Sequence, residues 1–317
     1  MSVEAEGPLG VLLMAHGTPD RIKDVEAYYT DIRRGRPPSP QQLADLVARY
    51  ERVGGTARLR AVTFEQAEAL RRSLSETGVA ACVQVAMKHW RPSIAEAMRA
   101  LAAGQVRSAV GVVLAPHYSR LSVGQYVERA EAERALSAPS MQVAYVERWG
   151  LNPSLIELLA GRVREGLAGC DPRRALALFT AHSLPERIRT WGDPYEQEVT
   201  ATAGAVASAL SLPLWRVAWQ SAGATPEPWI GPDVLTVLRE AARERMCDQV
   251  LVCPVGFTAD NLEVLYNLDV EAAGVAADLG LGFRRTPSLN AHPGLIAALQ
   301  AEVLAAAAWL TPPAERG

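Results

Sequence analysis

Short, nearly continuous apolar segments alternate with longer amphipathic segments along the chain. Continuous apolar segments are typical of strands covered on both faces of a parallel sheet, and the amphipathic segments between them are typical of helices. This alternation predicts a doubly wound α/β fold. The expected strands are Gly10–Ala15, Ala81–Met87, Ala109–Ala115, Gln142–Val146, Ala175–Thr180, Leu214–Trp219 and Gln249–Val255. The expected helices include Phe64–Glu76, Ser93–Ala103, Val123–Leu136 and Asp233–Met246.

Two strand ends share a pattern that divides the chain into similar halves. Ala-His, a small residue and, two positions further, a proline occur at Ala15–Pro19 and again at Ala181–Pro185. We therefore predict two domains, residues 1–160 and 161–317. Because open α/β sheets bind ligands at the carboxyl ends of their strands, His16 and His182 are expected near one site between the domains.

A third histidine, His117, also follows an apolar run. Taken alone, a histidine after a strand is more often a structural hydrogen-bonding group than a ligand. Strand ends at one edge of a sheet converge, however, so three such histidines together favour a site there. We expect His117 to lie near His16 and His182.

Glu263 follows the last expected strand and allows two interpretations. A helix is expected to begin near Asp260, a good N-cap residue, and Glu263 would then complete a capping box. Alternatively, Glu263, Asn267 and Glu271 lie at i, i+4 and i+8 and form one polar stripe on a helix. Such a stripe either conducts protons or ions or is a solvated face.

A basic and aromatic stretch near the N-terminus is a candidate binding surface. Guanidinium groups bind carboxylates well, and tyrosine rings can stack on a flat ring. The alternative is an ordinary charged surface helix. The residues are Tyr28, Tyr29, Arg33, Arg34, Arg36, Arg49, Tyr50 and Arg52.

Composition excludes several classes of protein. The chain has 317 residues, of which 49% are hydrophobic, enough to bury a large core in about two domains. A net charge of −3 argues against a general nucleic-acid binder. No apolar run of about 18 residues is present, so no integral membrane segment is expected. The acidic N-terminus is unlike a signal peptide, and we expect a cytoplasmic protein.

The cysteines and glycines do not indicate a cofactor site. None of the cysteines forms a CxxC pair, and we expect reduced, mostly buried thiols rather than an iron–sulfur or zinc site. Gly54-Gly55 lacks the rest of a GxGxxG pattern, and neither a Walker A motif nor a GxSxG serine elbow is present. The cysteines are Cys82, Cys170, Cys247 and Cys253.

From Ala181 to Tyr195 the chain reads AHSLPERIRTWGDPY, which closely resembles the ferrochelatases. The resemblance extends through nearly the whole chain and is most similar to the soluble bacterial branch that metallates coproporphyrin III. It includes LLMAHGTPD, YYTDIRRGRPP, RYERVGG, MKHWRPSI, LAPHYSRLSVGQY, WQSAGATPEPWIGPDV and CPVGFTADNLEVLYNLDVE.

The resemblance implies an enzyme of heme biosynthesis that inserts Fe²⁺ into coproporphyrin III in a cleft between two Rossmann-like domains. It implies that His182 binds the incoming metal or accepts a pyrrole proton, and that Glu263 faces it as metal ligand and proton relay. Iron is then the substrate, and no tightly bound cofactor is expected. The implied porphyrin contacts are His16, Arg33, Arg49, Tyr50, Ala57, Lys88, His89 and Tyr126.

Four positions depart from the family pattern. His16 stands where the nearest relatives carry tyrosine, which leaves open whether an imidazole replaces a phenolate as the axial contact to iron. Asn261 stands where many carry histidine, and Ala57 replaces a serine. Asn267 stands where an acid is common and cannot carry a proton. Actinobacterial relatives hold an iron–sulfur cluster with C-terminal cysteines, but this chain has none after Cys253, so no cluster is expected.

Metallation requires that iron lose its water and that two pyrrole N–H protons leave. A neutral imidazole suits ferrous iron and, with an ordinary pKa of ~6.5, accepts a proton near neutral pH. A facing carboxylate can hold the metal or the second proton. The arginines near Arg33 and Arg49 suit the four propionates of coproporphyrin, where each sheltered charge-assisted bond contributes about 1.5–3 kcal/mol.

Three alternatives stay open at this point: a protoporphyrin IX ferrochelatase, a cobalt chelatase on the same scaffold, and a non-catalytic porphyrin or heme carrier with His16 as heme ligand. The His182–Glu263 pair argues against a carrier, because a carrier needs no proton acceptor. The expected partners are the porphyrin and a transient partner enzyme of the heme pathway, with no nucleic acid. We expect a monomer.

Overall fold

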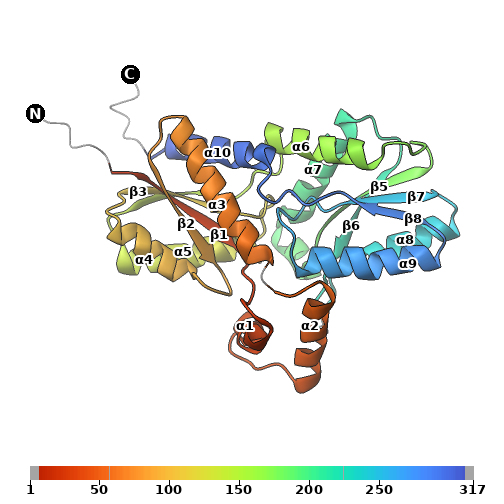
Figure 1. The fold of residues 1–317 in the computed structure, drawn as a ribbon, viewed down its shortest axis with the longest axis horizontal. Helices are drawn as coiled ribbons and strands as arrows, with labels where there is room; N and C mark the ends of the chain where they lie inside the picture. The colour runs from red at the N-terminus through yellow and green to blue at the C-terminus, as the bar shows by residue number, and fades with distance from the viewer. Residues whose placement is uncertain (1–6, 57, 224, 311–317) are drawn as a thin grey trace, which may run out of the picture.

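The computed structural model describes residues 7–56, 58–223 and 225–310. They form two four-stranded parallel sheets flanked by helices (Figure 1). The first sheet has the order β2-β1-β3-β4, with β1 Leu9–Ala15, β2 Ala81–Met87, β3 Ser108–Val113 and β4 Gln142–Val146. The second has the order β6-β5-β7-β8, with β5 Ala175–His182, β6 Trp215–Gln220, β7 Gln249–Cys253 and β8 Gly282–Arg285.

Each sheet therefore orders its strands second, first, third, fourth, which confirms the α/β fold with two similar halves. The helices are α1 Val25–Ile32, α2 Pro40–Arg52, α3 Arg58–Glu76, α4 Ile94–Ala103, α5 Val123–Ser137, α6 Pro153–Gly166, α7 Tyr195–Ala209, α8 Val234–Arg243, α9 Ala273–Asp278 and α10 Pro293–Ala307. Two 3₁₀ turns, η1 Ile22–Asp24 and η2 Glu186–Trp191, and a π-helix, η3 Val264–Ala272, complete the described elements.

The predicted strands are present, with ends that differ by up to two residues. The strand β8 was not predicted, because its only large apolar residue is Phe283 and two arginines follow it. It lies at the edge of its sheet, where a strand needs no continuous apolar run.

The sheets are buried because their strands are apolar on both faces. In β1 the side chains from Val11 to Met14 are fully buried, and in β5 so are Leu176, Leu178 and Phe179. Each buried side chain of this size contributes about 1.5–3 kcal/mol from its removal from water. The strands therefore form a rigid base whose carboxyl ends are held in place.

The last helix crosses from one half to the other. Helix α10 contacts α6 and also α3, β3 and β4 of the first sheet. One core cluster consequently includes buried residues of both sheets, such as Leu13, Phe179 and Leu299. The division of the chain at residue 160 stays a prediction.

Helices α1 and α2 project from the body beneath the region where the two sheets meet (Figure 1). Ser39 begins α2 with a capping box, in which its hydroxyl accepts a hydrogen bond from Gln42 N. Within the described residues, no helix is both long enough and apolar enough to span a bilayer.

Candidate active site at the carboxyl ends of the strands

The carboxyl ends of four strands carry five of the ten predicted site residues. His16 follows β1, Lys88 and His89 follow β2, and His182 is the last residue of β5. Glu263 lies after β7, directly before the π-helix η3. We call His16, Lys88, His89, Tyr126, His182 and Glu263 the carboxyl-edge site.

His182 and Glu263 form a close pair. Nε2 of His182 lies 3.3 Å from Oε1 of Glu263, and the two side chains are 35% and 39% exposed. Nδ1 of His182 faces the carbonyl oxygen of Ser183. Nε2 is thus directed at the carboxylate, as expected of an imidazole whose orientation is set at its other nitrogen.

Each member of the pair changes the pKa of the other. Burial alone lowers the pKa of His182, but the Glu263 carboxylate reverses this effect and the pKa lies above its ordinary value. Burial alone raises the pKa of Glu263, but the charge and hydrogen bond of His182 hold it below its ordinary value. Each side chain therefore favours the charged form of the other.

The start of the helix that carries Glu263 differs from the prediction. Asn261, not Asp260, caps it, because the Asn261 side chain accepts a hydrogen bond from Val264 N at 3.0 Å. Asp260 is instead buried beside Arg58 at 2.8 Å and accepts a hydrogen bond from Asn290 at 3.2 Å. Glu263 consequently forms no capping box, and its side chain is available to His182.

The polar stripe after Glu263 lies on a π-helix rather than an α-helix. Asn267 accepts a hydrogen bond from the Ser221 hydroxyl at 2.8 Å and donates one to Glu271 at 2.5 Å. Ser221 also bonds to Glu263 and lowers the pKa of that carboxyl, after the larger effects of burial, His182 and His16. Glu263, Ser221, Asn267 and Glu271 thus form one connected polar row.

His16 is electrostatically coupled to this pair. Burial lowers the pKa of His16, and the Glu263 carboxylate opposes that shift. Nδ1 of His16 lies 3.2 Å from the Tyr28 hydroxyl, and its ring lies 4.8 Å from the ring of His89. Solvent nevertheless reaches His16. The lowered pKa favours the neutral form of the His16 ring, which Tyr28 and His89 hold in place.

His89 and Lys88 both have lowered pKa values. Burial and the neighbouring His16 lower the pKa of His89 to about 3, although its Nδ1 lies 2.7 Å from Asp31. Burial and the charges of Arg129 and Arg34 lower the pKa of Lys88 to about 8. Nζ of Lys88 donates to Gln125 at 2.7 Å and lies 4.9 Å from the ring centroid of Tyr126. Tyr126 is buried and supports the ammonium group.

Only some residues of the arginine and tyrosine stretch lie near this site. Tyr50 is buried, and its hydroxyl lies 3.4 Å from that of Thr18. Arg49 lies over the ring of Tyr266 of η3, 5.1 Å from its centroid. Arg33 stacks on Tyr29 at the end of α1, and the structure shows no contact between it and the carboxyl-edge site. Ala57 lies outside the described residues.

His117 is not among the exposed residues of this site, although its ring lies 6.5 Å from that of Tyr195, whose hydroxyl bonds to the carbonyl oxygen of His182. His117 is only 2% exposed, and its Nε2 lies 2.9 Å from the Thr202 hydroxyl. Burial lowers its pKa to about 3. Gly150 packs so closely that an added Cβ would lie 2.8 Å from the ring. His117 is therefore a buried hydrogen-bonding group between the two halves of the fold.

Two residues next to the pair were not singled out in the sequence. The Tyr195 hydroxyl donates to the carbonyl oxygen of His182 at 2.9 Å. Gln220 ends β6 in register with His182, and its amide donates to the carbonyl oxygen of Glu263 at 3.3 Å. The signal that could have found Gln220 is its polar side chain at the end of an otherwise apolar strand.

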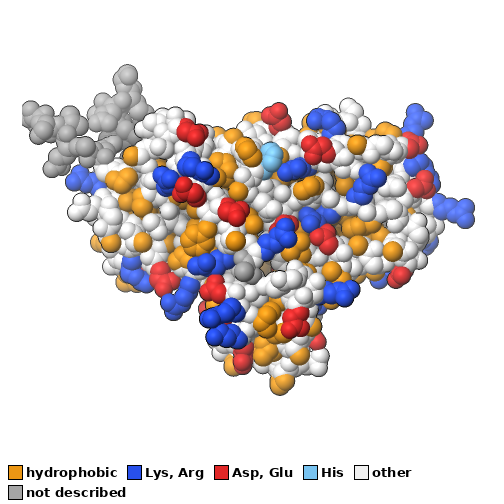
Figure 2. Space-filling model, viewed as in Figure 1, with side chains coloured by type: hydrophobic (Ala, Val, Ile, Leu, Met, Phe, Trp, Pro, Cys, Tyr) orange, Lys and Arg blue, Asp and Glu red, His pale blue; other side chains and the backbone are white. Residues whose placement is uncertain are grey.

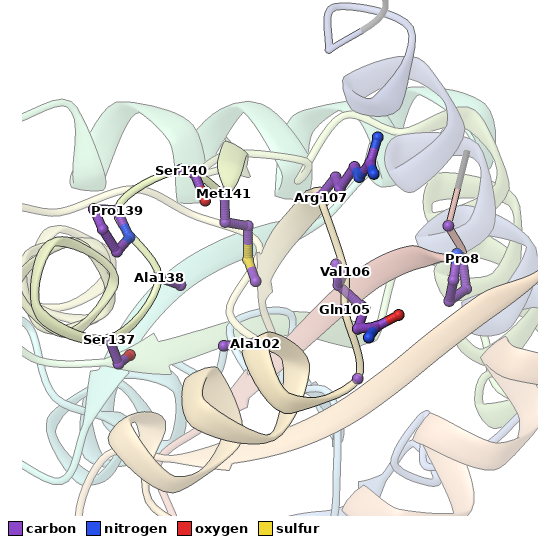
Figure 3. Close-up of a pocket in the computed structure, with 12 residues that line it drawn as sticks. Pro8, Ala102, Gln105, Val106, Arg107, Ser137, Ala138, Pro139, Ser140 and Met141 are labelled. Atoms are coloured by element: carbon purple, nitrogen blue, oxygen red, sulfur yellow. The ribbon is translucent and has the colours of Figure 1, made fainter. Parts of the chain in front are cut away.

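One cavity near the first sheet lies at the other end of the strands. It has a volume of about 580 Å³ and is lined by residues that precede β1, β3 and β4, such as Pro8, Arg107 and Met141 (Figure 3). It contains no histidine or acid among its lining residues. On the face shown in Figure 2, basic side chains are interspersed with acidic ones. Neither feature competes with the carboxyl-edge site for the chemistry.

A family model named Ferrochelatase matches residues 8–307. The chain belongs to the ferrochelatase family. It is 41% identical over 302 residues to the coproporphyrin III ferrochelatase of Anoxybacillus flavithermus, covering 93% of this chain and 95% of that protein. It is 42% identical over 319 residues to the ferrochelatase of Thermus thermophilus, covering 95% and 99% of the two chains.

Solved structures agree on the fold of this ferrochelatase family member. The sirohydrochlorin chelatase SirB from Bacillus subtilis subspecies spizizenii, in complex with cobalt, matches with a TM-score of 0.60 and 14% identity, covering 95% of this chain and 96% of that one. CbiX, described as the terminal enzyme of siroheme biosynthesis in denitrifying bacteria, matches with a TM-score of 0.53 and 15% identity, covering 94% and 99%. At this identity the likeness shows the fold alone.

The described residues contain no group of three or more His, Cys, Asp or Glu side chains arranged to hold a metal. Cys247 and Cys253 are buried, and Cys82 and Cys170 are half-buried free thiols. Burial raises the pKa of Cys253 to about 12. A thiol in that state is a poor metal ligand. That the chain carries no iron–sulfur cluster stays a prediction.

Proposed function

We propose that this protein inserts Fe²⁺ into coproporphyrin III to form coproheme, with His182 and Glu263 as the residues at the metal. The observation that carries the proposal is the pairing of one imidazole and one carboxylate at 3.3 Å, both partly exposed, at the carboxyl ends of the strands. Relatives named coproporphyrin III ferrochelatase, at 38–41% identity, support the choice of substrate.

Two protein ligands suit a metal that is delivered rather than kept. A resident structural metal in proteins is usually held by a full set of ligands, whereas this pair leaves coordination positions open. The porphyrin nitrogens would fill those positions as the metal leaves the pair. Ferrous iron accepts both imidazole nitrogen and carboxylate oxygen.

Insertion must remove two protons and changes no oxidation state. Two pyrrole N–H bonds break, the nitrogen lone pairs bind iron, and the two protons leave to the protein or to water. Once His182 is neutral, it can accept one proton, and the Glu263 carboxylate can accept the other. Asn267 cannot carry a proton, so a relay along the π-helix would run from Glu263 by Ser221 and water toward Glu271.

Basic side chains around the site suit a substrate with several carboxylates. Arg49 lies beside the π-helix, and Lys88 lies beside Tyr126. We propose that these groups, with Arg33 at the end of α1, bind propionates, and that His16, His89, Tyr50 and Ala57 line the porphyrin. A charge-assisted bond of this kind contributes about 1.5–3 kcal/mol when sheltered.

A metallation assay with two porphyrins tests the proposal. The protein is mixed anaerobically with Fe²⁺ and either coproporphyrin III or protoporphyrin IX, and the absorption change is followed. Fast turnover of coproporphyrin with little turnover of protoporphyrin is expected. The reverse preference would change the substrate and keep the chelatase. Tight porphyrin binding without metallation of either would show a carrier, with His16 the first residue to examine as heme ligand.

The variant His182→Ala separates chemistry from binding. We expect iron insertion to fall by a factor of at least about 100, because the proton acceptor and metal ligand are lost together, while the Kd for coproporphyrin stays within about threefold. His117→Gln is the control for loss of an imidazole, since His117 bonds to the Thr202 hydroxyl rather than to Glu263. An equal loss of binding and insertion in His182→Ala would mean that His182 only shapes the site.

A further inference from the structure

Gln220 is a buried polar side chain in a position where an apolar one would fit. It ends β6 and is 4% exposed. Its Oε1 has no hydrogen-bond partner among the described residues. Burying an amide without satisfying both of its polar atoms costs free energy. An apolar residue of similar size would avoid that cost, which points to a role for the amide beyond packing.

Gln220 contacts the segments of both members of the pair. Its carbonyl oxygen accepts a hydrogen bond from Ser183 N at 2.7 Å, one residue after His182. Its side-chain Nε2 donates to the carbonyl oxygen of Glu263 at 3.3 Å. Strand β5, which carries His182, lies between β6 and β7 in the sheet (Figure 1). Gln220 therefore reaches past β5 to the segment that follows β7.

The next residue strengthens the same connection. Ser221 has a left-handed backbone conformation, with φ of 61°. Such a conformation is unfavourable for a residue other than glycine and is retained where the surroundings require it. It places the Ser221 hydroxyl 2.8 Å from Asn267. The end of β6 thus contacts the backbone of Glu263 through one residue and the π-helix through the next.

We propose that Gln220 is a positioning residue for metal insertion, which sets the distance between the Glu263 carboxylate and the His182 imidazole. This inference rests on the proposed function of the pair. Without the amide donor, Glu263 keeps its chemistry but its backbone loses its link to the strand beside His182. Partners that orient metal ligands in this way typically account for 10–100-fold in metal affinity or activity.

The variant Gln220→Met tests this role, because methionine fills a similar volume without a donor. We expect kcat for iron insertion to fall by about 10–100-fold and KM for coproporphyrin to change by less than about threefold. The affinity for Zn²⁺ in the absence of porphyrin should weaken by a similar factor. Calorimetry measures this affinity, and binding that persists in His182→Ala is subtracted because it belongs to other sites. Gln220→Asn, which withdraws the donor by one methylene, should show the same direction.

Gln300→Met is the matched control. Gln300 of α10 also donates its amide to a backbone carbonyl, that of Ser73 of α3 at 2.6 Å, and not to a segment of the pair. The variant Gln300→Met should lower the melting temperature without changing kcat. Unchanged kcat and Zn²⁺ affinity in both Gln220 variants would overturn the inference, and so would losses no larger than those of Gln300→Met. If wild-type protein fails to metallate any porphyrin, the proposed function fails, and the Zn²⁺ titration still decides whether Gln220 positions the pair.

Discussion

The histidines show that surroundings, more than residue type, decide what an imidazole can do in this protein. His117 is buried against Thr202, and burial lowers its pKa to about 3. His292 caps α10 by accepting a hydrogen bond from Gly294 N. Within the described residues, His182 has the Glu263 carboxylate at its Nε2, and this carboxylate raises its pKa. The candidate proton acceptor is therefore identified by its partner.

Removing the Glu263 charge should lower the pKa of His182. Burial then acts with little opposition, so the pKa of His182 in Glu263→Gln should fall below the ordinary value of ~6.5. Because His182 must be neutral to bind metal, the acidic limb of any residual activity should shift to lower pH in this variant. NMR titration of the His182 ring gives the pKa directly.

Glu68→Gln is the control for this titration. Glu68 is an exposed acid on α3 that pairs with Arg71 at 2.8 Å rather than with a histidine. Its removal should leave the His182 titration unchanged. An unchanged titration in Glu263→Gln itself would show that the two side chains are not coupled in solution.

Among the elements, the loop after β7 decides the geometry of the site. Gly256 N donates to the carbonyl oxygen of Thr180 at 3.1 Å, which joins this loop to β5 close to His182. A Cβ at Gly256 would lie 2.6 Å from Cβ of Ala181. Glycine is thus required here by the close approach of two backbones. The loop then leads into the π-helix, an element that occurs frequently at functional sites.

Gly256→Ala should separate this loop from β5. Overpacking of this kind costs about 1–3 kcal/mol of unfolding free energy. We also expect kcat to fall by about tenfold, because a shift of the loop moves Glu263 relative to His182. Denaturant unfolding and the metallation assay measure the two effects.

Gly274→Ala is the matched substitution, since no atom lies within 4 Å of a Cβ at that position of α9. It should be neutral or stabilising by up to about 1 kcal/mol, as expected for alanine in a helix. If Gly256→Ala behaves like Gly274→Ala, the close approach of the loop and β5 does not persist in solution.

At the scale of the whole molecule, polar contacts join the two halves beside the site. Asp193, before α7, accepts hydrogen bonds from the Ser119 hydroxyl at 3.0 Å and from Arg120 N at 2.8 Å. Glu198 of α7 accepts one from Tyr118 N at 2.7 Å. These bonds connect the loop after β3 to the segment that also holds Tyr195. The relative position of the halves is therefore coupled to the residue that supports His182.

Asp193→Ala should weaken this connection. It leaves the buried Ser119 hydroxyl without its acceptor and removes a charge-assisted bond, so we expect unfolding free energy to fall by about 2 kcal/mol. Metallation should slow as well, because the halves lose a contact beside the site. Thermal unfolding and the coproporphyrin assay provide the measurements.

Asp171→Ala provides the comparison for Asp193→Ala. Asp171 is exposed and accepts a hydrogen bond from Arg173 N within its own turn, at 2.9 Å. Its loss should change stability by less than about 0.5 kcal/mol and leave activity unchanged. Equal stability of the two variants would show that the Asp193 contacts do not hold the halves together.

The sequence by itself indicated the fold class and the two similar halves, and its resemblance to the ferrochelatases implied the roles of His182 and Glu263. Apolar segments report strand burial directly, and the Ala-His pattern recurs at the same place in each half. Only the tertiary structure decided which histidines share the site. His117 also follows a strand, but its ring packs between the two halves. Burial there lowers the pKa of the ring to about 3.

The tertiary structure also decided how Glu263 reaches His182. The local signal favoured Asp260 as a helix cap, but Arg58 and Asn290, distant in sequence, bind that carboxylate and leave Asn261 as the cap. Gln220 shows the same limit, because its role depends on strand order rather than on neighbouring residues. Local propensities predict helices and strands, whereas contacts between distant segments set the positions of side chains. The free energies of those contacts arise only after the chain has folded.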